Sequence, residues 1–128
     1  IETPYSDLDI ICYSSNKLEF EEVLIKNFSK NKNFKIFNTS INTIDTIIAK
    51  FELNEEFFEI FGQNRNSIEQ EAYLHLLKES YILKSNGELF KRKIIELKLA
   101  GLKTEPAFAK LLNLKGNPYQ AILDYPCL

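Results

Sequence analysis

The sequence predicts an α+β fold in which a sheet of mixed or antiparallel strands is flanked by helices and followed by a helical C-terminal part. Two observations predict this class. Segments of the first half are rich in β-branched and aromatic residues, which is typical of strands. Segments of the second half repeat apolar residues at helical spacing. With 128 residues, the chain is long enough for one domain with a sizeable core, so we expect a single domain over 1–128.

Composition and charge argue against several functional classes. The formal net charge of −2 argues against broad electrostatic binding to nucleic acid or to acidic membrane surfaces. No apolar run approaches the roughly 20 residues that are needed to cross a bilayer. Cys12 and Cys127 lack paired metal-ligand spacing, so we expect reduced thiols and a cytoplasmic location. The sequence does not predict an oligomeric state.

The first strand is predicted at Leu8–Tyr13, where β-branched and aromatic residues dominate. Asn16 and Glu19 then have the spacing of a capping box, which predicts a helix of about three turns. Its apolar residues recur every four positions, and the polar cluster Ser29–Asn33 ends it. The chain therefore begins with a strand and an amphipathic helix.

The middle of the chain is predicted to be an antiparallel meander. Strand composition returns in three segments, which are 34–37, 43–53 and 56–61. Asn54-Glu55 is short enough to be the turn of a hairpin between the last two segments, and Gly62 ends the third. The third segment is therefore expected to lie inside the sheet.

The second half is predicted to hold three helices, which are 67–84, 88–100 and a helix from Thr104 to the break at 116–118. Ser67 and Gln70 fit a capping box at the start of the first helix. Asn86-Gly87 separates the first helix from the second, and Gly101 stands where a left-handed C-cap is expected. Thr104 can cap the third helix. A short apolar tail follows the break.

Asp7 and Asp9 lie two residues apart at the start of the first strand. Because side chains alternate along a strand, both are expected on one face, with Leu8 and Ile10 on the other. Glu59 stands among apolar residues, where a carboxylate needs a partner. Three carboxylates from two strands could hold one or two magnesium ions. Alternatively, Asp7 and Asp9 are ordinary turn residues, and Glu59 faces solvent or pairs with a lysine.

His75 shares one helical face with Glu71 and Glu79. A metal or substrate contact is conceivable, although a lone histidine beside glutamates is more often a hydrogen-bonded surface or cleft residue. Lys103 lies in a predicted interhelical turn, where it can reach into a cleft and where helix amides can bind an anion. The basic residues of this half more often form a solvated helix face. They are Lys84, Lys91, Arg92, Lys93, Lys98 and Lys103.

Several stretches carry a family resemblance, and they are 6–12, 58–63, 70–73 with His75, 101–109 and 116–119. Together they resemble the DUF4269 family of uncharacterised bacterial proteins over almost the whole chain. That family is similar to a distant branch of the nucleotidyltransferase superfamily, which implies a nucleotidyltransferase-like fold. The resemblance implies that Asp7, Asp9 and Glu59 occupy the three metal-binding positions. It further implies Mg²⁺ or Mn²⁺ as the cofactor and a nucleoside triphosphate as the substrate.

The implied reaction moves a nucleoside monophosphate to a hydroxyl group of an unknown small molecule or protein. Ser6, Lys103 and Thr104 are the candidate nucleotide contacts, and Gln63 and His75 are weaker candidates for substrate contacts. Two alternatives remain. One is a catalytically degenerate protein that binds a nucleotide or a metabolite, and the other is an interaction module that keeps only the fold.

The superfamily places a Gly-Ser or similar phosphate-binding motif on a helix before the Asp-x-Asp pair. This sequence begins at Ile1 and contains no methionine, so we expect an N-terminal helix and strand to be missing upstream.

Overall fold

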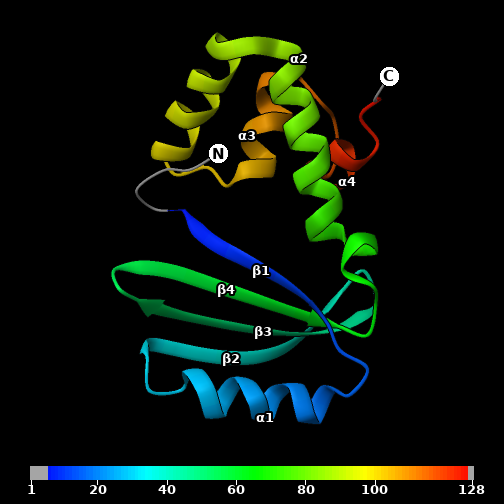
Figure 1. Cartoon of the computed structure of the whole chain (residues 1–128). Helices are drawn as coiled ribbons and strands as arrows, with labels where there is room; N and C mark the ends of the chain where they lie inside the picture. Colours follow the sequence, from blue (N-terminus) through cyan, green and yellow to red (C-terminus); the bar gives the residue numbers. More distant parts are fainter. Residues whose placement is uncertain (1–5, 127–128) are drawn as a thin grey trace. The chain divides into compact units, whose positions relative to one another are not determined.

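The structure, a computed structural model, describes residues 6–126 (Figure 1). The chain divides into two compact units. The sheet unit comprises residues 7–70, and the helical unit comprises residue 6 and the residues from 71 onward. Within the described range, no helix is both long and apolar enough to span a membrane. Each unit has its own buried core. The single domain predicted from the length of the chain stays a prediction.

A four-stranded mixed sheet forms most of the sheet unit. Its strands are β1 (Asp7–Tyr13), β2 (Lys32–Ile41), β3 (Ile44–Leu53) and β4 (Glu56–Gln63). The order is β1-β4-β3-β2, in which β3 pairs antiparallel with both β2 and β4, and β1 pairs parallel with β4. The predicted α+β class and the predicted meander are confirmed, and β4 lies inside the sheet.

Two tight turns connect the antiparallel strands. Asn42 and Thr43 have φ values of 47° and 68°, and Asn54 and Glu55 have φ values of 52° and 66°. Two successive residues with positive φ match the right-handed twist of a hairpin. The turn predicted at Asn54-Glu55 is confirmed. The turn at Asn42-Thr43 lets pairing continue to the end of β2, which is why that strand is longer than the predicted segment 34–37.

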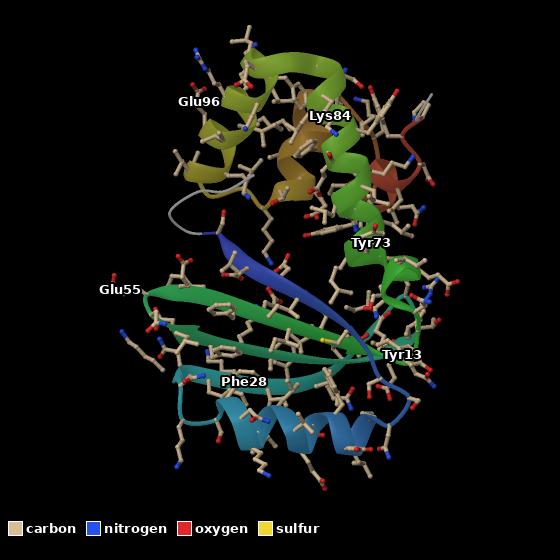
Figure 2. All side chains as sticks on the ribbon, viewed as in Figure 1. Tyr13, Phe28, Glu55, Tyr73, Lys84 and Glu96 are labelled. Carbon is tan, nitrogen blue, oxygen red and sulfur yellow. The ribbon has the colours of Figure 1, made fainter. Side chains whose placement is uncertain are left out.

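Helix α1 (Lys17–Phe28) packs against one face of the sheet. It begins as predicted, because the Asn16 side chain accepts a hydrogen bond of 3.1 Å from the Glu19 backbone N–H. At its other end lies Phe28, which is labelled in Figure 2. The Phe28 ring stacks on the Phe51 ring with centroids 4.6 Å apart. The buried core under this helix consists of Leu24, Ile47, Ala49, Phe51 and Ile60.

The helical unit contains α2 (Glu71–Leu99), α3 (Thr104–Leu111) and α4 (Pro118–Leu123). Gly87 interrupts α2 with φ 81° and ψ −175°, at the point where the ribbon changes direction (Figure 1). The predicted separation of two helices at this glycine is therefore confirmed. The core of the unit gathers apolar residues from all three elements, and they are Ile82, Ile94, Ala107, Phe108 and Ile122.

The helix predicted to open at the Ser67 capping box begins later. Residues Ser67–Glu69 form a 3₁₀ helix, and the Asn66 side chain accepts a hydrogen bond from the Ile68 N–H. The Gln70 side chain is used elsewhere, because its Nε2 donates to the Cys12 carbonyl at 2.7 Å and to the Arg65 carbonyl at 3.0 Å. The Ser67 hydroxyl donates to the Ile11 carbonyl at 3.4 Å, and the Gln70 backbone is extended, with φ −73° and ψ 143°, so no α-helical turn begins at Ser67.

The prediction that Thr104 caps the third helix is wrong by one residue. Thr104 is the first residue inside α3, and Lys103 is the N-cap without a side-chain capping bond. The predicted C-cap at Gly101 is confirmed, since Gly101 has φ 111° and its N–H donates to the Lys98 carbonyl. The tail after 116–118 includes α4, which Asn117 caps by accepting bonds from two backbone N–H groups.

Candidate functional site

The sheet unit brings the three predicted metal ligands together. Asp9 on β1 lies in register with Glu59 on the neighbouring strand β4, and Asp7 lies two residues before Asp9. Ile60 packs under α1, so its neighbour Glu59 projects to the other face of the sheet. Asp7 and Asp9 are exposed, and Glu59 is half-buried. Alternation and register therefore place all three carboxylates on the face opposite α1.

Glu59 is the electrostatic centre of this acidic face. Burial raises the pKa of the Glu59 carboxyl above its ordinary value, and the charge of Lys50 opposes that rise. A side-chain hydrogen bond with Asp7 and the charges of Asp9 and Asp7 raise the pKa further. Lys50 Nζ lies 3.6 Å from Glu59 Oε1. Glu59 thus feels the positive charge of Lys50 and the negative charges of Asp7 and Asp9 at the same time.

The chemistry of these donors suits a hard divalent cation, because carboxylate oxygens are the ligands that Mg²⁺ and Mn²⁺ prefer. A hydrogen bond between two carboxyl groups requires a proton, and a bound cation would replace it. Among residues 6–126, no three His, Cys, Asp or Glu side chains are already positioned around one ion position. The carboxylates are therefore neighbours without being a preformed ligand set.

His75 is buried in the helical unit and is used by the fold. Its Nε2 lies 2.8 Å from the Tyr119 carbonyl oxygen, and its ring meets the Tyr119 ring edge-on at a centroid distance of 6.0 Å. His75 is only 7% exposed to solvent. This contact ties α2 to α4, the helix that the sequence did not predict. A substrate contact at His75 stays a prediction.

The remaining nucleotide candidates lie outside the sheet unit. Ser6 directly precedes β1 and is half-buried. Lys103 is exposed, and its carbonyl accepts a hydrogen bond of 3.0 Å from the Ala107 N–H. Thr104 is half-buried at the start of α3. The roles of these residues in nucleotide binding stay predictions.

Gln63 is buried at the end of β4, with 6% exposure. Its Nε2 donates a hydrogen bond of 2.9 Å to Thr46 Oγ1. Its Oε1 is buried and has no hydrogen-bond partner within the described part of the chain. An unsatisfied buried amide oxygen is uncommon in folded proteins, so Gln63 is a candidate for a ligand contact.

Sequence reasoning missed an acidic pair in the helical unit. The pKa of Glu79 is raised to about 8, chiefly by burial and further by the charge and hydrogen bond of Glu105, while the charge of Lys98 opposes the rise. Burial and the charge of Glu105 also raise the pKa of Tyr119. Glu79 was visible on the His75 face of α2. Its pairing with Glu105 depends on how α3 packs, for which the sequence carries no direct signal.

Only Cys12 of the two cysteines lies within the described residues, and its thiol is free. Burial raises the pKa of this thiol. Cys127 lies outside the described residues.

The fold and the acidic face define an α+β protein with a mixed four-stranded sheet that carries three neighbouring carboxylates on one face. The family model described as "Domain of unknown function (DUF4269)" matches residues 1–125, and the chain belongs to this family. The family inferred from the sequence is therefore confirmed. Neither the curated proteins nor the solved structures contained a match to the chain.

Proposed function

We propose that the chain is a magnesium-dependent nucleotidyltransferase that moves a nucleoside monophosphate from a nucleoside triphosphate to a hydroxyl acceptor. The observation that supports this proposal is the placement of Asp7, Asp9 and Glu59 on one face of two adjacent parallel strands. Register fixes Asp9 beside Glu59, and alternation brings Asp7 to the same face. The resemblance to the nucleotidyltransferase superfamily supports the same assignment.

The proposal gives the two carboxylates of β1 one role and the carboxylate of β4 another. Asp7 and Asp9 are exposed at the start of β1 and supply oxygen ligands from one strand. Glu59 supplies a third oxygen from β4 or orients the acceptor hydroxyl. Bound Mg²⁺ would lower the pKa of that hydroxyl and neutralise charge on the triphosphate. The hydroxyl loses its proton to a neighbouring water as its oxygen bonds to the α-phosphorus. The bond from that phosphorus to the oxygen that bridges it to the β-phosphate breaks, and pyrophosphate leaves.

A cation that binds Glu59 must displace Lys50, its ion-pair partner. The Lys50 side chain is 46% exposed and reaches Glu59 from β3, on the side away from Asp9. A divalent cation would attract Glu59 toward Asp7 and Asp9 and release Lys50 to solvent. Because the Lys50 side chain is partly exposed, water can solvate its ammonium group once the pair separates, and the cation would take over the charge compensation of the less exposed Glu59.

The same ion pair favours the alternative of an interaction module that keeps only the fold. In that case Lys50 is the lasting partner of Glu59 and the acidic face needs no cation. The two functions differ in one respect that can be measured, which is whether Mg²⁺ binds to these carboxylates.

Thermal unfolding with Mg²⁺ and each nucleoside triphosphate tests the proposal, on the wild type and on D9N. A ligand that binds only the native state stabilises it by about 2.7 kcal/mol at about 100 times its Kd. We expect a Tm increase of several degrees with magnesium and at least one triphosphate, and we expect D9N to lose it.

E56Q is the matched control, because Glu56 is an exposed carboxylate on the same strand as Glu59 but points to the other face. It should keep the full magnesium-dependent shift. The proposal fails if no triphosphate produces such a shift in the wild type, or if D9N responds as strongly as the wild type.

A further inference from the structure

A small pocket lies in the sheet unit where β1 and β4 end and α1 begins. Its volume is about 270 Å³, which suits a ligand smaller than most drug-sized molecules. Phe20, Ile47 and Gly62 form its apolar part. Ile47 belongs to the core under α1, and Gly62 faces Phe20. The apolar part therefore lies on the α1 side of the sheet and shares no residue with the acidic face.

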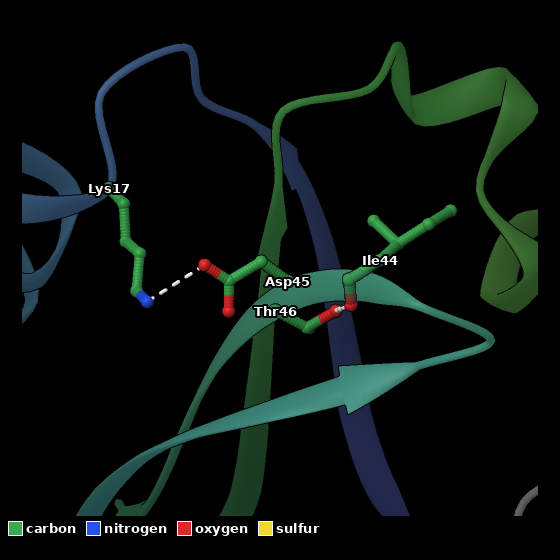
Figure 3. Close-up of polar contacts among 4 residues, drawn as sticks. All are labelled: Lys17, Ile44, Asp45 and Thr46. Atoms are coloured by element: carbon green, nitrogen blue, oxygen red, sulfur yellow. Dashed lines mark hydrogen bonds and ion pairs between the residues drawn. The ribbon is translucent and has the colours of Figure 1, made fainter.

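Lys17 and Asp45 bring opposite charges to this pocket. Lys17 Nζ lies 2.8 Å from Asp45 Oδ2, so the pair joins the first turn of α1 to the start of β3 (Figure 3). The two side chains are 41% and 65% exposed. Such an exposed ion pair contributes little to stability. A ligand with both charges can therefore replace each partner at a low cost.

Polar groups surround this ion pair. Ser14, Ser15 and Asn64 line the pocket together with Gln63, whose buried Oε1 has no hydrogen-bond partner within residues 6–126. Lys17 is the first residue of α1, and the positive end of a helix dipole favours an anionic group nearby. The pocket thus combines an anion-binding side, an acidic group and an apolar wall.

We propose that this pocket binds a small zwitterion, namely an α-amino acid with a short apolar side chain. Its carboxylate would meet Lys17 and the start of α1, and its ammonium group would meet Asp45. Its side chain would lie against Phe20 and Ile47. In an α-amino acid one carbon atom separates the two charged groups, which suits a pocket whose opposite charges are in direct contact.

Ligands with one charge fit this arrangement less well. An anion would leave Asp45 beside its negative charge, and a cation would leave Lys17 beside its positive charge. An apolar molecule would take water away from Lys17 and Asp45 without offering either charge a new partner, which costs free energy. The inference stands apart from the proposed nucleotidyl transfer, because it uses none of the acidic-face carboxylates.

Two-dimensional ¹H–¹⁵N NMR of the full chain tests this inference, with L-valine as the probe. Isobutylamine and isovalerate are the matched probes, since each keeps the apolar group and one of the two charges. We expect valine to shift the amide signals of Ser15, Lys17 and Asn64 and the side-chain amide of Gln63. Each single-charge probe should bind at least about tenfold more weakly.

K17M and D45N should each weaken valine binding by about tenfold or more, whereas K26M should leave it unchanged. Lys26 is an exposed lysine on the same helix. Three results would overturn the inference: no valine-dependent shift at these residues, equal binding of either single-charge probe, or unchanged valine binding in both K17M and D45N. The comparison of probes on the wild type stands even if a variant folds poorly.

Discussion

Asp9 and Glu59 are register partners on two adjacent parallel strands, and Lys50 approaches Glu59 from the third strand. The carboxylate in the centre therefore has a negative neighbour on one side and a positive neighbour on the other. This arrangement makes Glu59 sensitive to both protons and cations. The predictions below use that sensitivity and the contacts that hold each unit together.

Replacing Glu59 with glutamine should separate its electrostatic role from its structural role. The raised pKa means that the native state binds a proton that the unfolded state releases, so stability falls as pH rises through that pKa. E59Q cannot ionise, and it should lose this slope. At neutral pH without metal, we expect E59Q to be within about 1 kcal/mol of the wild type, or more stable.

Urea unfolding from acidic to neutral pH checks this expectation, with E56Q as the control for loss of one carboxylate. A large loss of stability in E59Q at neutral pH would favour the interaction-module alternative, since it would make the Lys50–Glu59 pair a structural contact.

The acidic pair of the helical unit predicts a second pH dependence. The Glu79 pKa rises from 4.5 to about 8 on folding, so its contribution destabilises the native unit progressively as pH rises between those values. E79Q should remove this slope and stabilise the unit at alkaline pH. Urea unfolding followed by far-ultraviolet circular dichroism measures the effect. E96Q, which removes an exposed glutamate of α2, should keep the wild-type slope.

Gly62 is required by the approach of Phe20. A Cβ atom at this position would lie 2.1 Å from Phe20 Cε1, so the whole ring must move. G62A should destabilise the sheet unit by about 1–3 kcal/mol, as measured by urea unfolding. The double variant G62A/F20L should recover part of this loss, because the smaller side chain clears the new methyl group. Equal stability of G62A and the wild type would contradict this contact.

Gln70 links the end of β1 to the loop before α2. Its side chain retains 1% of its exposure and donates to the Cys12 and Arg65 carbonyls. Q70A should cost about 1–3 kcal/mol because both carbonyls lose their donor. Q70E keeps the shape without the amide donor and should also be destabilised. If Q70E were as stable as the wild type in urea unfolding, the two hydrogen bonds would not be the cause.

Much of the fold could be predicted because its signals are local. Asn16 caps α1 with its own side chain, Asn54-Glu55 closes a tight turn, and Gly87 interrupts a helix through its own φ angle. Each of these residues acts on backbone within a few positions. Such signals survive any arrangement of the rest of the chain.

Helix starts were displaced where neighbouring polar residues compete for one role. Asn66 caps the 3₁₀ helix that replaces the predicted helix start at Ser67, and the Ser67 hydroxyl donates to the Ile11 carbonyl instead. Lys103 takes the cap position that was assigned to Thr104. In both cases a contact or backbone geometry outside the local pattern decided the outcome.

The three carboxylates of the candidate site could be predicted from the sequence, but their pairing across strands and the approach of Lys50 could not. Alternation along β1 places Asp7 and Asp9 together, and the sequence marks Glu59 by its apolar neighbours. The parallel pairing that sets Asp9 beside Glu59 joins segments about fifty residues apart, and no local pattern specifies it. The approach of Lys50 follows from the hairpin register and was foreseen only as an unspecified lysine.

Paramagnetic broadening by Mn²⁺ is a direct test of whether Asp7, Asp9 and Glu59 bind a divalent cation. In ¹H–¹⁵N spectra of the full chain, substoichiometric Mn²⁺ should selectively broaden the amide signals of β1 and β4 around these three residues. Excess Mg²⁺ should restore the signals, and D9N should not show the broadening. If broadening is absent, or if it appears elsewhere on the chain and is unchanged in D9N, these three carboxylates do not bind the cation.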